Sequence, residues 1–221
     1  MRVNLEARAA AAENRRAQTR ERLLKAAVVV IGEKGFDAAS IEDFVAAAEV
    51  SRGTFYNYFP TMEDLLRAVR RKLTDALMAV LDAHLPPTIP VSSRLATRLH
   101  SHFALVASDP AWGWVVMRLD GTRLGRTPAM EESFDRMYSE GVASGEFRPA
   151  DLDAIRSLVF GTSRMVQRDI LMGLAAPGHS ERVVALLLMT FGVAPQAADR
   201  ISRDSASRAA QIQAEVPLHA V

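Results

Sequence analysis

Apolar residues recur at steps of three and four along most of this chain, and such spacing predicts amphipathic helices. The first helix is expected from about Thr19 to Lys34, where Gly35 can end it, and a longer helix is expected over 61–85. Proline-containing breaks separate further helices, which are expected at about 91–108, 111–122, 128–144, 151–174 and 180–192. No strand-like alternation or hairpin signal occurs, so the sequence predicts an all-α fold.

Two short helical patterns follow one another between residues 39 and 66, and the second is too short to be stable alone. A helix, a tight turn and a second short helix form the arrangement that places a recognition helix in the DNA major groove. Three candidate N-caps mark the helix starts in this stretch: Ser40 with Asp43, Ser51, and Thr61 with Asp64.

Polar and aromatic side chains are concentrated in the second short helix. A small bundle whose aromatic rings simply pack together would explain Phe55 and Phe59. It would not explain the consecutive Tyr56, Asn57 and Tyr58, because burying an unpaired amide or hydroxyl costs about 1–3 kcal/mol. These three side chains are therefore expected to face solvent or a polar partner, which favours a DNA-binding surface.

This segment resembles the DNA-binding domain of TetR-type (tetracycline-repressor-like) transcriptional regulators. The resemblance begins near Thr19, covers about the first quarter of the chain, and is most specific at the Tyr-x-Tyr-Phe core of residues 56–59. The family usually has glycine in the turn where this chain has Glu49, so the turn is made either without a positive φ angle or with strain. The family usually has lysine where this chain has Met62, which removes one phosphate contact.

Eight residues are expected to contact DNA. Arg52 is the candidate for a bidentate contact with a guanine edge, and Gly53 lets the backbone approach closely. Thr54 suits a thymine methyl or a phosphate, while Tyr58 suits a phosphate or internal packing. The resemblance implies phosphate-positioning roles for Ser40, Tyr56 and Asn57. The complete set is Ser40, Ser51, Arg52, Gly53, Thr54, Tyr56, Asn57 and Tyr58.

The segments 151–174 and 180–192 are apolar on more than one side. A single neighbouring helix cannot cover so wide an apolar surface. These helices are therefore either surrounded by other helices of the same chain or packed against another chain. In the family that this chain resembles, the last two helices of each subunit form a four-helix dimer interface, and two-fold pairing brings two recognition helices to successive major grooves. We therefore expect a homodimer. The expected interface residues are Ile155, Leu158, Val159, Val184, Leu187, Leu188 and Phe191.

The resemblance also implies a small-molecule effector, which binds among the helices after residue 85 and tilts the DNA-binding domains apart through the long helix. The apolar and aromatic side chains around residues 112–117 favour an apolar or aromatic effector with one polar group. Ordinary core packing is the competing interpretation for each of them. The candidates are Phe103, Trp112, Trp114, Met117, Arg118, Phe134, Met137, Tyr138, Arg164, Met165 and Gln167.

Charge is unevenly distributed, although the net charge of the 221 residues is only +1. Residues 1–25 hold seven Arg or Lys against three Glu, which is typical both of an arm that reaches DNA phosphate and of a solvated tail.

There are no cysteines, which excludes disulfides and thiolate metal sites and fits a reducing cytoplasm. No signal peptide and no run of the ~20 apolar residues that span a bilayer is apparent, so a cytoplasmic protein without membrane contact is expected.

The sequence shows no arrangement of residues that is typical of a catalytic site. The five histidines are scattered, and His100 and His102 fall on opposite sides of one helix, which suits no single metal site. Asp120, Glu131 and Glu132 are more typical of a solvated helix terminus than of an acid–base pair. We therefore expect no enzyme activity, no cofactor and no bound metal.

The expected organisation is a basic, flexible arm (1–18), a helix-turn-helix domain (19–60), a long linking helix (61–85), a helical effector-binding and dimerisation domain (86–196) and a flexible tail (197–221). The tail is assigned because the segment from Ala197 has few large apolar residues. The expected function is that of a DNA-binding homodimer, most simply a repressor, which binds a pseudo-palindromic operator and is released by a small molecule. The alternative is a helical ligand-binding or scaffold protein whose N-terminal module has lost operator recognition.

Overall fold

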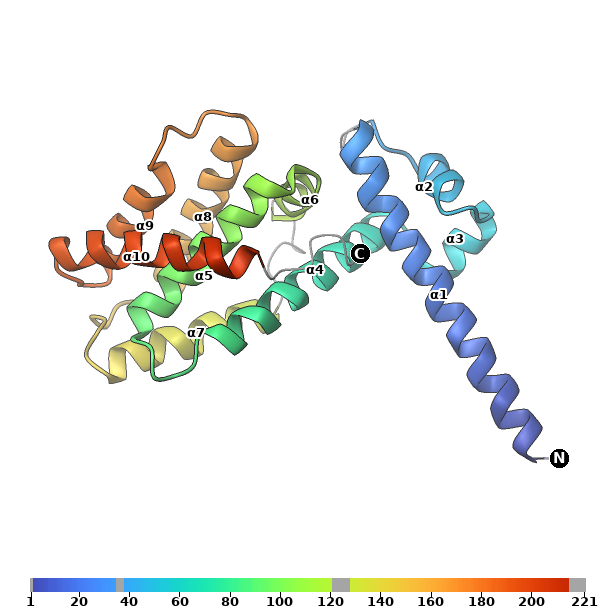
Figure 1. Cartoon of the computed structure of the whole chain (residues 1–221), viewed down its shortest axis with the longest axis horizontal. Helices are drawn as coiled ribbons and strands as arrows, with labels where there is room; N and C mark the ends of the chain where they lie inside the picture. Colours follow the sequence, from blue (N-terminus) through green and yellow to red (C-terminus); the bar gives the residue numbers. More distant parts are fainter. Residues whose placement is uncertain (1, 35–37, 121–127, 215–221) are drawn as a thin grey trace. The chain divides into compact units, whose positions relative to one another are not determined.

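The computed structural model describes residues 2–34, 38–120 and 128–214, and these form helices joined by short turns (Figure 1). No strand occurs in these ranges, and the predicted all-α fold is confirmed. The described helices are α1 (Arg2–Lys34), α2 (Ile41–Ala47), α3 (Arg52–Tyr58), α4 (Met62–His84), α5 (Val91–Ser108), α6 (Pro110–Asp120), α7 (Pro128–Ala143), α8 (Leu152–Leu171), α9 (His179–Thr190) and α10 (Pro195–Gln213).

The described chain divides into two compact units, one built from residues up to Leu73 and the other from Thr74 onward. The division falls inside α4, so this helix contributes residues to both units. The prediction of a long helix shared by two halves of the chain therefore agrees with the course of α4.

The core of the first unit consists of large apolar side chains from all four of its helices. Six of them have no exposed surface: Leu23 and Leu24 of α1, Phe44 of α2, Phe55 of α3, and Leu65 and Val69 of α4. Burying one such side chain contributes about 1.5–3 kcal/mol. This packing stabilises α2 and α3, which have only 7 residues each and could not persist as isolated helices.

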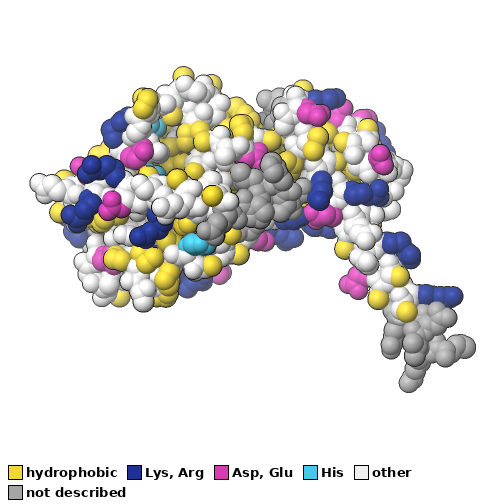
Figure 2. All heavy atoms as spheres, in the orientation of Figure 1, with side chains coloured by type: hydrophobic (Ala, Val, Ile, Leu, Met, Phe, Trp, Pro, Cys, Tyr) yellow, Lys and Arg dark blue, Asp and Glu magenta, His cyan; other side chains and the backbone are white. Residues whose placement is uncertain are grey.

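The first helix is longer than predicted. α1 begins at Arg2 rather than at about Thr19, so the expectation of a flexible arm over 1–18 is wrong for the described residues. Residues 7–18 are exposed, and Lys and Arg side chains are spaced along this part of α1 (Figure 2). The run is rich in Ala, Arg and Glu, which have high intrinsic helix propensity. The spacing of apolar residues does not reveal this part of the helix, because its side chains are exposed and form no buried apolar face.

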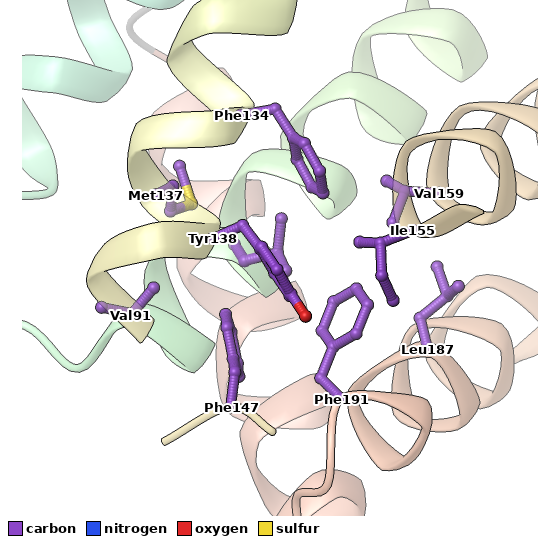
Figure 3. Packing of buried hydrophobic residues seen from close by; sticks show 10 residues of the cluster. Val91, Phe134, Met137, Tyr138, Phe147, Ile155, Val159, Leu187 and Phe191 are labelled. Atoms are coloured by element: carbon purple, nitrogen blue, oxygen red, sulfur yellow. The ribbon is translucent and has the colours of Figure 1, made fainter. Parts of the chain in front are cut away.

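The second unit is organised around α5, which packs against α6, α7, α8, α9 and α10. Part of its core is an aromatic cluster in which the Tyr138 ring centroid lies 6.2 Å from that of Phe134, 6.1 Å from that of Phe147 and 6.0 Å from that of Phe191 (Figure 3). The Tyr138 hydroxyl donates a hydrogen bond to the Arg148 carbonyl at 2.9 Å, so its one polar atom is satisfied.

The described part of the predicted flexible tail, residues 197–213, belongs to a packed helix, so the prediction is wrong for these residues. α10 lies against α5 and α9, and it buries Ala198, Ser202, Ser205 and Ala209. Small residues at steps of three and four let two helix backbones approach closely. The sequence did not reveal this face because the prediction relied on large apolar residues, and only Ile212 of that kind is buried here.

Candidate DNA-binding and effector sites

N-terminal caps position both short helices of the first unit. Ser40 Oγ accepts the Asp43 N–H at 3.3 Å and the Asp43 carboxylate accepts the Ser40 N–H at 3.0 Å, which forms a capping box on α2. Ser51 Oγ accepts the Thr54 N–H at 3.0 Å at the start of α3. Thr61 Oγ1 accepts the N–H three residues later at 3.1 Å. The three predicted N-caps are confirmed, and the hydroxyls of Ser40 and Ser51 take part in capping.

The turn between α2 and α3 contains a strained residue. Glu49 has φ 53°, the one positive value among the described residues other than glycine. The Val50 N–H donates to the Val45 carbonyl at 3.0 Å and the Glu49 N–H donates to the Ala46 carbonyl at 3.1 Å, which is the Schellman pattern of a helix C-terminus. This motif favours glycine at the left-handed position, where a side chain costs about 1–2 kcal/mol. Of the two alternatives open for this turn, the strained one is correct.

Replacing Glu49 with glycine is expected to stabilise the protein by about 0.5–1 kcal/mol. The substitution removes the left-handed strain, and the greater flexibility of glycine in the unfolded chain offsets part of that gain. Urea unfolding of the purified protein measures the change. Ala46→Gly is the control, since Ala46 lies in a right-handed helical turn and its replacement should cost about 0.5–1 kcal/mol. A loss of stability in Glu49→Gly would contradict the strain argument.

Six of the eight predicted DNA contacts lie on α3, whose apolar side is turned inward. Phe55 is fully buried, whereas Tyr56 is 41% exposed and Asn57 and Gly53 are also exposed. Thr54 and Tyr58 are half-buried. The helix therefore presents a polar surface to solvent, as expected for side chains that cannot be buried without partners.

Arg52 is held in place on this surface. Its guanidinium donates to the Glu42 carboxylate of α2 at 2.5 Å and to the Tyr56 hydroxyl at 3.3 Å, and it lies 5.7 Å from the centre of the Tyr56 ring. The hydrogen bond to Tyr56 and the charge of Glu42 raise the pKa of Arg52 above its usual value. The Arg52 and Glu42 side chains are both 62% exposed, so water screens their attraction and a phosphate or a base edge can compete for the guanidinium.

Two arginines of α1 contact aromatic rings at the end of α3 and directly after it. The Arg16 guanidinium carbon lies 5.9 Å from the centre of the Tyr58 ring, and that of Arg20 lies 5.4 Å from the centre of the Phe59 ring. Cation–π contacts of this kind contribute about 0.5–1 kcal/mol at exposed sites. Basic side chains of α1 therefore adjoin the polar surface of α3.

Most of the predicted dimer-interface residues are buried within the single chain, so the prediction is wrong for them. Six of the seven side chains are at most 6% exposed within the single chain, and they pack inside its own core: Ile155, Val159, Val184, Leu187, Leu188 and Phe191. Leu158 differs, with 39% of its surface exposed. The exposed apolar residues on the same two helices also include Met165 (51%) and Leu186 (58%). Because both sides of α8 and α9 are apolar in sequence, the pattern alone could not tell the inward side from the outward side.

The predicted effector-binding residues are divided among several environments. Phe134, Met137 and Tyr138 belong to the aromatic core, and Phe103 belongs to a second apolar cluster with Val166. Trp112 and Gln167 are buried, Met117 is half-buried, and three residues are exposed: Trp114, Arg164 and Met165. The side chain of Arg118 lies outside the described residues. Ser163 of α8, which is 7% exposed, was not among the predicted residues.

Membrane-spanning helices and metal sites do not occur in the described ranges. No helix there is long and apolar enough to cross a membrane. No three His, Asp or Glu side chains of those residues are grouped in a way that could hold a metal ion.

Comparison with known proteins bears on the first unit most directly. The family model for bacterial regulatory proteins of the tetR family matches residues 23–69, which include α2, α3 and their caps. The fatty acid metabolism regulator protein of Bacillus subtilis (strain 168) is 26% identical over 149 residues, or 63% of this chain and 77% of that protein. The HTH-type transcriptional repressor LfrR of Mycolicibacterium smegmatis is 34% identical over 90 residues, but this match spans only 47% of that protein.

Structural similarity extends through both units. The crystal structure of RolR in complex with resorcinol is 28% identical, covers 86% of this chain and 95% of its own, and has a TM-score of 0.65. The tetR-family match contains the capped helices α2 and α3, and the shared architecture continues into the second unit. Residues 23–69 therefore match the bacterial regulatory proteins of the tetR family, and the fold of both units is similar to that of RolR.

Proposed function

We propose that this protein represses transcription by binding a pseudo-palindromic operator as a homodimer, and that a small-molecule effector releases it. The observation that carries the proposal is the outward polar surface of α3, on which Arg52, Tyr56 and Asn57 are exposed. This helix follows a capped helix and a Schellman turn, as a recognition helix does in a helix-turn-helix.

The residues on α3 have complementary roles in this proposal. Arg52 exchanges the Glu42 carboxylate for a guanine edge, and such a bidentate contact contributes about 1–3 kcal/mol of base discrimination. Tyr56 and Asn57 donate to phosphates, which position the protein without reading the sequence. Gly53 supports this, because a Cβ at that position would meet only the Ser51 hydroxyl oxygen, at 3.8 Å, and the backbone can come close to DNA.

The exposed apolar residues of α8 and α9 support the homodimer. Leu158, Gly161 and Met165 recur at steps of three and four and share one face of α8, and Leu186 of α9 is also exposed. A Cβ built on Gly161 meets nothing within 4 Å, so a second helix can approach closely there. We name Leu158, Gly161, Met165 and Leu186 the outer apolar face, and we assign it to the two-fold interface.

The effector proposed for this protein is small and apolar or aromatic. RolR, one of the similar proteins of known structure, binds resorcinol in its crystal. In this chain, Trp112 is packed against the His102 ring with centroids 5.1 Å apart, so an aromatic environment exists between α5 and α6. Resorcinol is therefore the first compound to test for release of DNA.

A gel shift with the DNA upstream of the protein's own gene tests the proposal, at salt concentrations from about 50 to about 200 mM. Wild-type protein is expected to bind, and Arg52→Ala should lose about 1–3 kcal/mol of preference for its own site over mismatched sites. Tyr56→Phe should weaken binding to all sequences alike, because it removes a phosphate contact.

Arg200→Ala is the matched control for the loss of an arginine, since Arg200 is an exposed residue of α10 in the other unit. Its footprint and salt dependence should equal those of the wild type. If wild-type protein shifts no DNA even at low salt, the proposal is wrong and the alternative of a ligand-binding or scaffold protein is favoured.

A further inference from the structure

The outer half of α1 extends past the other helices of the first unit (Figure 1). The side chains of residues 7–18 are all exposed, whereas Leu23 and Leu24 further along the same helix are fully buried. A short isolated helix is marginal in water, but these outer turns continue a packed helix and need no nucleus of their own. The unit therefore presents an exposed helical segment that its own core does not require.

Positive charge predominates in this segment. Residues 7–18 contain Arg8, Arg15 and Arg16 against one acidic residue, Glu13. Arg8 and Arg15 are about two helical turns apart and share one face of α1, and Arg16 is next to Arg15. Glu13, two residues from Arg15, lies on the other side of the helix from it. We name Arg8, Arg15 and Arg16 the basic face of α1.

The basic face begins beside the polar surface of α3. The Arg16 guanidinium carbon is 5.9 Å from the centre of the Tyr58 ring, at the end of α3. Arg8 lies about 12 Å further along the helix axis, since each residue of an α-helix adds about 1.5 Å. Duplex DNA carries one negative charge per about 1.7 Å of its axis, so a duplex bound at α3 offers several phosphates over that distance.

Alanine is the only hydrophobic residue type in residues 7–18. A partner helix in a coiled coil requires large apolar side chains at regular positions, and a helix that lies on a lipid surface requires Leu, Phe or Trp along one face. The segment offers neither. A polyanion requires only the arginines, because a guanidinium binds phosphate through paired, charge-assisted hydrogen bonds. Nucleic acid is therefore the partner that its chemistry fits.

We infer that Arg8 and Arg15 bind phosphates of the operator DNA next to those contacted by α3. The inference rests on the proposed function and adds a second DNA-contacting surface to it. Because these arginines stand on a preformed helix, binding does not require the ordering of a disordered arm, which would lower the affinity. Phosphate contacts carry no sequence information, so this surface strengthens binding to any duplex while α3 selects the operator.

Gel shifts with the double variant Arg8→Gln/Arg15→Gln test the inference. Glutamine has nearly the helix propensity of arginine, so the variant loses two charges and should keep the circular dichroism of the wild type. A homodimer contains each arginine twice, and each phosphate contact contributes about 0.9 to the slope of log affinity against log salt. The slope should therefore become shallower by about 3–4. At about 100 mM salt, binding to operator and to mismatched DNA should weaken by the same factor, at least about tenfold.

Arg200→Gln/Arg203→Gln is the matched control, because it removes two exposed arginines from α10 in the other unit. Its salt slope should equal that of the wild type. Hydroxyl-radical footprinting on the same DNA locates the contacts. Wild-type protein should protect backbone positions next to those protected through α3, and Arg8→Gln/Arg15→Gln should lose protection only there.

A salt slope and a footprint of Arg8→Gln/Arg15→Gln that match the wild type would overturn the inference and show that the outer half of α1 is a solvated helix. An equal change of slope in the α10 control would also overturn it, since overall charge would then account for the effect. In both cases the wild type still binds its operator and the proposed function stands. Wild-type protein that shifts no DNA disproves the repressor function itself.

Discussion

Met165→Glu is expected to convert the homodimer to a monomer and to lower operator affinity by more than about a hundredfold. Met165 is 51% exposed in the single chain and belongs to the outer apolar face, so a partner must cover it in the proposed dimer. A two-fold interface contains each residue twice, and the substitution therefore buries two carboxylates. Two linked recognition helices bind about 10²–10⁴-fold more tightly than one, and that gain is lost with the dimer.

Light scattering at micromolar concentration measures the first effect, as a fall from twice the chain mass to the single-chain mass of 24.2 kDa. A gel shift measures the second effect. Leu186→Glu should behave in the same way, since Leu186 is 58% exposed on α9.

Val29→Glu is the control for the dimer experiment. Val29 is 53% exposed on α1 and lies in the first unit, so the same change of charge should leave the mass of the dimer intact. A Met165→Glu protein that stays dimeric would show that the outer apolar face is not the interface.

The sequence predicted local features, such as helix caps and helix bounds, more successfully than it predicted which helix faces pack against one another. Ser40, Ser51 and Thr61 were recognised as N-caps because a cap depends on residues three positions away. The bounds of α5 were predicted as 91–108 and are found at Val91–Ser108, because Pro90 and Pro110 limit the helix on both sides. Such signals are contained in a few neighbouring residues, so they need no knowledge of the tertiary structure.

The errors concern surfaces that are defined only by a neighbouring helix. α10 packs through Ala198, Ser202 and Ser205, and small residues carry no strong signal until their partner α5 is known. The inner and outer faces of α8 are both apolar, so Ile155 and Met165 look equivalent in sequence although they are 6% and 51% exposed.

The buried histidine of α5 should make the protein sensitive to acid. His100 is 4% exposed, and its Nε2 lies 3.0 Å from Ser202 Oγ, which itself donates to the Glu181 carbonyl at 2.8 Å. Because the serine proton is used in that bond, His100 donates its Nε2 proton to the serine oxygen. Burial lowers the pKa of His100 from 6.5 to about 4, although the nearby Glu181 carboxylate and the hydrogen bond to Ser202 oppose the shift.

The direction of the pH effect follows from these two pKa values. Above the unfolded pKa of 6.5 the ring is neutral in both states, so it contributes no pH dependence. As pH falls from 6.5 to about 4, the unfolded state binds a proton that the folded state excludes, and the free energy of unfolding decreases. The full loss is about 3 kcal/mol, since each unit of pKa difference corresponds to about 1.4 kcal/mol.

Two carboxylates with partners titrate in a lower range and do not obscure this loss. Hydrogen bonds from Lys34 and Ser40 hold the pKa of Asp43 below its ordinary 3.8, and the Arg156 guanidinium does the same for Asp135. Both groups favour the folded state while they are ionised, and their contribution is lost only as pH falls below 3.8. Burial raises the pKa of a third carboxylate, Glu146, but hydrogen bonds from Ser92 and Val91 outweigh it and hold the pKa below the ordinary 4.5, so its contribution is lost below that pH. The interval from about 6.5 to about 4.5 therefore lies above the range of these carboxylates and includes the change at His100.

Urea unfolding of His100→Leu at several pH values in that interval isolates the effect of the buried ring. The variant should lose most of the decrease in stability toward acid, because leucine binds no proton in the unfolded chain. Ser202 keeps its bond to the Glu181 carbonyl in this variant, so no hydroxyl is left unpaired. His179→Asn, at a half-buried position at the start of α9, should retain the wild-type acid slope. If His100→Leu and the wild type lose stability in parallel, the ring is not kept neutral by its place between α5 and α10.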